Sequence, residues 1–189
     1  RYFYLRDNAT GEYWNSGLFP VSPPGARLTT QVGLGYSRFE CQHAGIRCTS
    51  RVMVAPDEPV EMWEFALTNE SDRPRDLWLC PFVEWSLGGY GTVSSPYSYL
   101  RSTFDPARRA VSSYNSSDER PHGHYNAFLA TDGDVAGWCG GPRDFLGPFG
   151  TVTRPQALIN GQMANREAWC EELAGALAIK VPLAASETR

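Results

Sequence analysis

The chain has 189 residues, with 17 lysines and arginines against 21 aspartates and glutamates, so its formal net charge is −4. This balance argues against the basic surface by which proteins bind nucleic acid phosphates. No apolar run reaches the roughly 18 residues of a membrane span, so we expect neither nucleic acid nor membrane as a partner. Hydrophobic residues make up 42% and aromatic residues 13%, enough for a packed core.

The first predicted element is a hairpin. Apolar residues 2–5 and 13–14 flank the turn sequence DNATG at 7–11, whose Asp, Asn and Gly favour a tight reversal of the chain. A loop follows at 22–25, where two prolines precede a glycine.

The next elements alternate with a period of two, which is typical of β-strands. This pattern predicts strands at 46–54, 60–69, 76–85 and 177–181. The turn-forming segments 56–59 and 69–74 separate the first three of them.

The only helical signal lies within 165–178, where alanines and glutamates gather before Gly175. The strand-like alternation at 177–181 limits the length of any helix here, so we expect one short helix or a loop, followed by a strand. The sequence therefore predicts an all-β antiparallel sandwich with at most one short helix. Residues 1–5 already read as the middle of a strand, and we expect the domain to be incomplete at both ends.

Five cysteines stand at positions 41, 48, 80, 139 and 170, without CxxC spacing. A structural zinc site needs two pairs of Cys or His ligands at short spacing. Cys41 and His43 could form one pair, but the sequence contains no second pair. We expect reduced, mostly buried thiols in a cytoplasmic protein, and no bound metal.

No sequence motif of a nucleotide-binding loop, a metalloprotease or a nucleophile elbow occurs. Glu58, Glu61 and Glu64 lie on or beside one predicted strand, where Glu61 and Glu64 point in different directions. An acid–base pair must converge on one substrate atom. We therefore interpret these carboxylates as an exposed strand face with charges at its rim.

The stretch 112–125 is rich in polar and aromatic residues and contains two of the three histidines. Aromatic faces, amides and Arg suit sugar recognition, although a solvated hairpin loop is the simpler interpretation. A second candidate is 140–150, rich in Gly, Pro and Phe. It either packs against a sheet edge or presents Arg143 to an anion, and we favour the structural role because Asp144 adjoins Arg143.

Several sequence strings in register resemble one enzyme family, glycoside hydrolase family 94, formerly glycosyltransferase family 36. They are YFYLRD at 2–7, GEYW at 11–14, GLGYSRFE at 33–40, PVEMW at 59–63, LTNESDRPR at 67–75, FVEW at 82–85 and RDFLGPFG at 143–150. They follow the family order over nearly the whole chain. The family contains cellobiose, cellodextrin and chitobiose phosphorylases.

This resemblance implies that 1–189 forms most of an N-terminal β-sandwich of the galactose-mutarotase-like super-sandwich type. A catalytic (α/α)₆ barrel is then expected beyond Arg189, so we expect no catalytic residue within the segment and no activity from it alone. The implied reaction is inverting phosphorolysis of a β-glucoside. A carboxylic acid protonates the leaving oxygen while inorganic phosphate attacks the anomeric carbon, with no metal or organic cofactor.

In this family a loop of one subunit's sandwich reaches the active site of the other subunit in a homodimer. The corresponding residues here are Tyr114, Asn115, Arg120, His122 and His124. Family members often have consecutive arginines in this loop, of which only Arg120 remains. The implied partners are a β-linked glucose-containing disaccharide or oligosaccharide, a sugar 1-phosphate and a second subunit.

Three other readings stay open. In these alternatives the chain is a non-catalytic carbohydrate-binding sandwich, a dimerisation domain, or the phosphorylase-like region of a cyclic β-1,2-glucan synthase. The sequence YNAF at 125–128 favours the cellobiose-type branch over the last of these.

Overall fold

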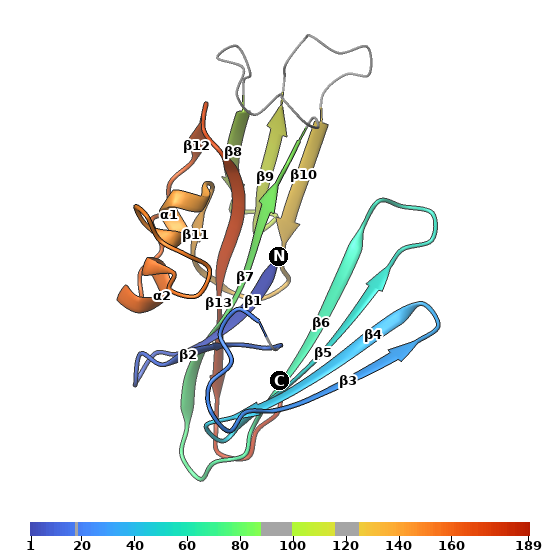
Figure 1. Ribbon diagram of the computed structural model, residues 1–189, viewed down its shortest axis with the longest axis vertical. Helices are drawn as coiled ribbons and strands as arrows, with labels where there is room; N and C mark the ends of the chain where they lie inside the picture. The colour runs from blue at the N-terminus through green and yellow to red at the C-terminus, as the bar shows by residue number, and fades with distance from the viewer. Residues whose placement is uncertain (18, 88–99, 116–124) are drawn as a thin grey trace.

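A computed structural model describes residues 1–17, 19–87, 100–115 and 125–189, which form antiparallel strands and two short helices (Figure 1). The first strands are β1 (Tyr2–Asp7), β2 (Tyr13–Asn15), β3 (Arg27–Gly33), β4 (Tyr36–His43), β5 (Ile46–Val54), β6 (Glu61–Asn69) and β7 (Arg75–Trp85). The remaining elements are β8 (Leu100–Asp105), β9 (Ala110–Asn115), β10 (Tyr125–Ala130), β11 (Val135–Cys139), α1 (Pro142–Leu146), α2 (Gln156–Asn160), β12 (Ala168–Trp169) and β13 (Leu173–Leu183). None of the helices in these ranges is long and apolar enough to span a bilayer.

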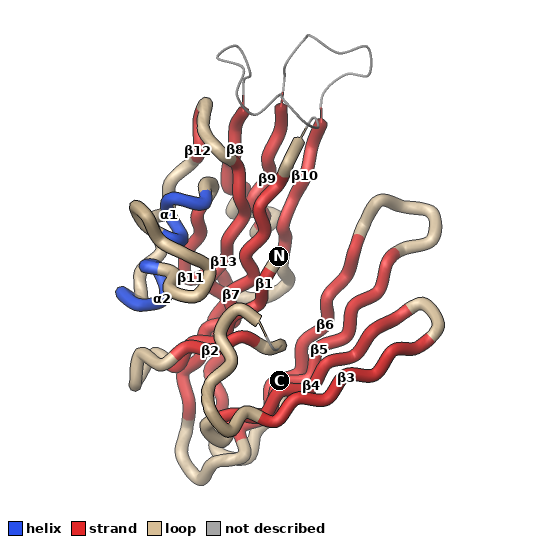
Figure 2. Tube along the Cα trace, in the orientation of Figure 1, coloured by secondary structure: helices blue, strands red, loops and turns tan. Residues whose placement is uncertain are grey.

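These strands form three sheets. The central sheet has five strands in the order β11-β13-β7-β1-β2, and the other two have the orders β10-β9-β8-β12 and β3-β4-β5-β6. Both four-stranded sheets lie over one face of the central sheet, while α1 and α2 lie over its other face (Figures 1 and 2). The antiparallel sandwich predicted from the sequence is confirmed.

The central strands bury both faces, because their alternate residues enter two different cores. Leu79 of β7 and Leu177 of β13 belong to the core shared with the two smaller sheets. Cys80 and Ala176, each one position away, belong to the core beneath the helices. The period of two at 76–85 and 177–181 therefore reflects two buried faces, which is consistent with an apolar run on both sides of a strand.

Three of the four strands predicted from alternation agree closely with the observed bounds, and the fourth, at 177–181, is the middle of the longer β13. The strand at 46–54 is β5 without change, and the strands at 60–69 and 76–85 differ from β6 and β7 by one residue. The 7–11 turn is also confirmed: the Asp7 carboxylate accepts hydrogen bonds from the Ala9 N–H at 2.8 Å and the Thr10 N–H at 3.4 Å. Gly11 takes a φ of 75°, which glycine adopts without steric cost.

Of the two conformations expected within 165–178, a short helix or a loop before a strand, the structure has no helix, and the expectation of at most one short helix is wrong because the described residues contain two. Within 165–178, Ala168 and Trp169 pair with β8, and the chain enters β13 at Leu173. The described helices are α1 and α2, of five residues each. Alanine and glutamate favour a helix locally, but a long strand pairing with β7 outweighs that preference at 173–183.

A buried ion pair joins the first residue of β7 to the turns that follow β1 and β4. Arg75 donates from Nη2 to Asp7 Oδ2 at 2.6 Å and from Nη1 to the Ala44 carbonyl at 2.7 Å. The side chains of Arg75 and Asp7 are only 4% and 1% exposed. This pair fixes β7 against the β1–β2 and β4–β5 turns.

The cysteines follow the sequence expectation. Cys41, Cys48, Cys80 and Cys139 are buried free thiols, and Cys170 is exposed. Burial raises the pKa of Cys41 to about 11 and raises the pKa of the other three buried thiols further. No cluster of metal-ligating side chains occurs within the described ranges.

Candidate functional site

The candidate site lies at one end of the sandwich, which we call the Asn115 end. It is formed where β7 ends at Trp85, β9 ends at Asn115, and β8 and β13 begin at Leu100 and Leu173. This is the upper end of β7, β8 and β9 in Figure 1. Asn115 pairs with both Leu100 and Tyr125 in neighbouring strands. The two ends of the sequence-predicted loop are therefore held on adjacent antiparallel strands.

Of the five residues predicted for the loop, the structure describes Tyr114 and Asn115, which take opposite faces of β9. The Asn115 side chain is buried, and its Nδ2 donates to the Leu87 carbonyl at 2.9 Å. It therefore fixes the chain at the end of β7. Tyr114 is partly exposed on the outer face. Arg120, His122 and His124 lie outside the described residues.

Tyr114 belongs to a row of four directly paired residues on four neighbouring strands. Asn126 pairs with Tyr114, Tyr114 with Arg101, and Arg101 with Trp169. Directly paired residues place their side chains on the same face of a sheet. The outer face at the Asn115 end thus presents an amide, a phenol, a guanidinium and an indole side by side.

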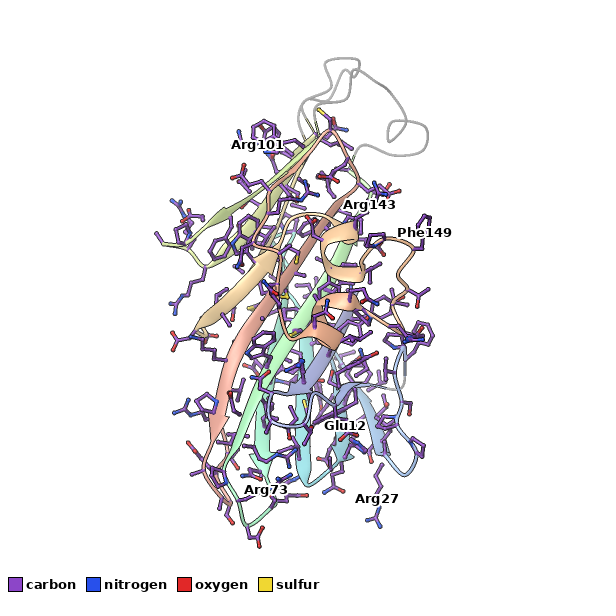
Figure 3. The ribbon with its side chains drawn as sticks, turned by 90° about the vertical axis from the view of Figure 1, so that its left-hand side faces the viewer. Glu12, Arg27, Arg73, Arg101, Arg143 and Phe149 are labelled. Atoms are coloured by element: carbon purple, nitrogen blue, oxygen red, sulfur yellow. The ribbon has the colours of Figure 1, made fainter. Side chains whose placement is uncertain are left out.

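The Arg101 guanidinium covers one side of the Trp169 ring, with 4.0 Å from Cζ to the ring centroid. Trp169 is 54% exposed and donates from Nε1 to Glu167 at 3.1 Å. Arg101 Nε is buried and has no hydrogen-bond partner among the described residues. Arg101 Nη2 lies 3.8 Å from the Glu167 carboxylate, which thus contacts both Arg101 and Trp169. An exposed indole beside a guanidinium suits contact with sugar hydroxyls or phosphate. Figure 3 shows Arg101 near the upper edge of the sheet.

The second sequence-predicted segment folds as α1 and the loop after it. Phe145 is fully buried and lies 4.7 Å from the Phe82 ring and 5.7 Å from the Tyr4 ring, measured between centroids. The segment therefore packs against the central sheet, as the structural interpretation required. Phe149, three residues after Leu146, is fully exposed (Figure 3).

The expected pairing of Arg143 with Asp144 is wrong. Asp144 accepts from Arg166 Nε at 2.9 Å, and Arg166 also pairs with Glu171 at 2.9 Å. The hydrogen bond to Asp144 raises the pKa of Arg166. Arg143 is exposed, and no ion pair to it occurs among the described residues. Residues 166 and 171 are far along the chain from 144, so sequence proximity favoured the wrong partner.

A small hollow of about 260 Å³ lies beside α1 at the Asn115 end. Its lining comes from the end of β7, the start of β8, the helix and the start of β13: Glu84, Trp85, Ser86, Leu87, Leu100, Pro142, Glu172 and Leu173. Its volume lies just below the roughly 300–1,000 Å³ of ordinary ligand pockets. Because the hollow is too small to hold a whole ligand, we interpret it as part of the border of the candidate site at the Asn115 end.

The two carboxylates of β6 have structural partners. Glu64 pairs with Arg51 at 2.6 Å on the outer face of its sheet. Glu61 accepts from the Trp63 indole and pairs with Arg1 at 2.8 Å. They do not converge, so they form no acid–base pair.

Sequence reasoning found Tyr114 but missed Arg101, Asn126 and Trp169. The alternation of residues 100–105 was the available signal for β8, since Arg101 and Thr103 flank the buried Ser102. The row itself depends on the register between strands that are far apart in the chain, which no local pattern gives.

Comparison with known proteins identifies related sequences over the whole domain. The sequence profile of a family described as "Glycosyl hydrolase 94, supersandwich domain" matches residues 1–189. The solabiose phosphorylase of Paenibacillus borealis is 39% identical over 177 residues, covering 94% of this chain and 23% of its own length. The N,N'-diacetylchitobiose phosphorylase of Vibrio furnissii is 30% identical over 192 residues, covering 93% and 22%.

A third relative has a different activity in its name. The cyclic beta-(1,2)-glucan synthase of Rhizobium meliloti is 29% identical over 158 residues, covering 84% of this chain and 6% of its own length. The chain spans less than a quarter of the length of each of these three relatives.

Proposed function

Because the chain belongs to the glycosyl hydrolase 94 family as a supersandwich domain, we propose that its parent protein is an inverting β-glucoside phosphorylase. The observation that carries this proposal is the 39% identity to a phosphorylase over 94% of the chain. A second relative with 30% identity is also a phosphorylase. The proposed substrates are a β-linked glucose-containing disaccharide or oligosaccharide and inorganic phosphate.

In the proposed reaction, a carboxylic acid protonates the oxygen between the two sugars while phosphate attacks the anomeric carbon from the opposite side. The C–O bond to the leaving sugar breaks as the C–O bond to phosphate forms, giving an α-sugar 1-phosphate and a shortened sugar. Phosphate is itself the nucleophile, so the proposed chemistry requires no base to activate water and no metal or organic cofactor.

The domain's proposed part is to shape the acceptor site from across a homodimer. In support, β9 and β10 hold residues 115 and 125 as an antiparallel pair, so the segment between them starts and ends at the Asn115 end. The exposed row of Tyr114, Arg101 and Trp169 adds an aromatic and cationic surface at the same end. We expect Arg120, His122 and His124 to act from this segment on the partner's substrate.

The proposed location is the cytoplasm. It is supported by four buried, unpaired thiols, since a reducing compartment keeps cysteines free. We do not expect catalysis from residues 1–189 alone, since Glu61 and Glu64 are occupied by ion pairs and do not converge.

The experiment that tests the proposal is an acceptor panel with the full-length protein. Glucose 1-phosphate is supplied with glucose, cellobiose, N-acetylglucosamine or glucuronate, and release of inorganic phosphate is measured. A phosphorylase releases phosphate with one or a few acceptors and forms a defined di- or oligosaccharide. The competing activity, suggested by the glucan synthase relative, gives cyclic glucan products instead and would overturn the proposal.

A further inference from the structure

Trp169 stands at the border of the sheet β10-β9-β8-β12, at the Asn115 end. Its strand, β12, is the last in the order of that sheet and pairs only with β8 within the described residues (Figure 1). The residue is 54% exposed. A tryptophan side chain that stays in water gains little of the stabilisation that burial gives to large aromatic rings. Stability of the fold therefore does not explain why this indole lies on the surface.

Three contacts hold the indole in one orientation. The Arg101 guanidinium covers one side of the ring, with 4.0 Å from Cζ to the ring centroid. The Trp169 N–H donates to Glu167 Oε2 at 3.1 Å, and Arg101 Nη2 lies 3.8 Å from the same oxygen. The three side chains thus contact one another in a closed set. Because their positions are already fixed, they lose little conformational freedom when a ligand binds to them.

The same contacts determine which part of the ring is open. Arg101 belongs to β8, so its guanidinium lies on the β8 side of the indole, and Glu167 occupies the edge that carries the N–H. The exposed part of Trp169 is therefore mainly the ring face turned away from β8. The one polar atom of the indole is already used, so a ligand contacts this face by stacking on it and not through a hydrogen bond to the ring.

The charges beside the ring favour a neutral ligand. Arg101 is balanced by Glu167, and Arg166, three residues before Trp169, is balanced by Asp144 and Glu171. Neither arginine is a free cation that could pair with a phosphate group. A sugar hydroxyl both donates and accepts hydrogen bonds, so it can bond to the Glu167 carboxylate, whose side chain is 40% exposed. The surroundings thus suit a neutral ligand rich in hydroxyl groups better than an anion.

We propose that the open face of Trp169 binds one sugar ring of an oligosaccharide. The sugar stacks its C–H face on the indole, and a hydroxyl at its rim donates to Glu167. Arg101 is a positioning residue, because it supports the indole from the opposite side. The stacking follows from the geometry, whereas the choice of a β-linked glucose chain as the ligand rests on the proposed function.

Hydroxyl-radical footprinting of the full-length protein tests this inference, with oxidation measured at single residues by mass spectrometry. The probe is cellotetraose without phosphate, titrated to about 10 mM, because one stacked ring with few hydrogen bonds is expected to give a Kd of about 1 mM. At about ten times Kd roughly nine-tenths of the sites are filled, so the oxidation of Trp169 falls several-fold. Phe128 in β10 of the same sheet is 58% exposed and lacks such a set of contacts, so its oxidation stays unchanged.

Substitution of Arg101 tests its positioning role. Arg101→Ala removes the support behind the indole, so the cellotetraose concentration that half-protects Trp169 rises about fivefold. Arg101→Lys keeps a cation beside the ring and restores most of the affinity. Arg108→Ala is the matched control, since Arg108 is an exposed arginine paired with Asp105. Trp14 is fully buried, so it stays unoxidised as long as each variant is folded.

Four results overturn the proposal. Trp169 is oxidised equally with and without 10 mM cellotetraose, about ten times the expected Kd. Inorganic phosphate alone protects Trp169, which makes the site an anion site. Trp169 is already protected before sugar is added, which means that protein covers it. Arg101→Ala and Arg108→Ala give the same half-protecting concentration, which removes the role of Arg101.

The footprint and the enzymatic reaction fail separately, because the footprint is recorded without phosphate. Protection of Trp169 in a protein that does not phosphorolyse β-glucosides keeps this site and overturns the proposed function. Phosphorolysis by a protein whose Trp169 stays unprotected keeps the proposed function and overturns this site.

Discussion

Among single residues, the buried Asp7–Arg75 pair has the clearest energetic consequence. Burial by itself raises the pKa of Asp7, but hydrogen bonds from the Ala9 N–H and from Arg75 outweigh it and leave the pKa lowered. A carboxylate with a lowered folded-state pKa stabilises the fold above its unfolded value, about 3.9, and loses this contribution as the pH falls below it.

We predict that Asp7→Asn lowers the free energy of unfolding by about 3 kcal/mol at pH 6, because it leaves Arg75 buried without its counter-charge. The difference from the unsubstituted protein shrinks as the pH falls below about 4, because the unfolded chain then binds a proton at Asp7 that the folded protein, with its lowered Asp7 pKa, does not. Urea unfolding at pH 6, 4.5 and 3.5 measures this. Asp105→Asn is the control, since its pair with Arg108 is exposed and should matter much less. Equal effects of the two substitutions would contradict the account.

Arg120 carries the second prediction at this scale. In the full-length protein, Arg120→Ala raises the acceptor KM about tenfold or more, the loss expected for one hydrogen bond to a charged group. The melting temperature stays unchanged. Arg27→Ala is the matched control, because Arg27 is an exposed arginine at the opposite end of the molecule from Arg101 and Arg143 (Figure 3). Unaltered kinetics in Arg120→Ala would remove the loop from the acceptor site.

Among the elements, α1 contributes to stability through one side chain. Phe145→Ala removes a fully buried ring from between Tyr4 and Phe82 and is expected to lower the free energy of unfolding by about 3–5 kcal/mol. Phe149→Ala, in the following loop, removes a fully exposed ring and should have little effect. Urea denaturation of both variants measures the difference. A similar loss in both would mean that the loop after α1 packs in a way this structure does not contain.

The β1–β2 hairpin and the long strands β5, β6 and β7 were predictable from the sequence, whereas β8 to β12 and the two helices were not. Residues 46–54 alternate because β5 buries one face, and this pattern is local. The helical composition near Glu167 and Ala168 was misleading, because pairing with β8 and β7 decides the conformation there. A five-residue helix such as α1 has too few turns to leave a periodic pattern, and its Pro142 and Gly141 read as a loop.

At the scale of the whole molecule, the resemblance placed a candidate site in the segment from Tyr114 to His124, whose described residues lie at the Asn115 end, but it gave none of their neighbours on adjacent strands. The position of Tyr114 followed from resemblance to a family, and Arg101 and Trp169 joined it only through strand register. Sequence proximity likewise suggested Arg143 as the partner of Asp144, where the fold supplies Arg166. Contacts of this kind arise from tertiary structure, so a residue pattern alone does not contain them.

The central proposal is that the parent protein of this domain cleaves β-glucosides with phosphate and inverts the anomeric centre. The most direct measurement is proton NMR of the reaction of the full-length protein with its disaccharide and inorganic phosphate, alongside the isolated 1–189 chain. The account predicts a sugar 1-phosphate whose anomeric proton has the α coupling at the first time point, and no product from 1–189 alone. A β-sugar 1-phosphate, free glucose formed without phosphate, or turnover by the isolated chain would contradict it.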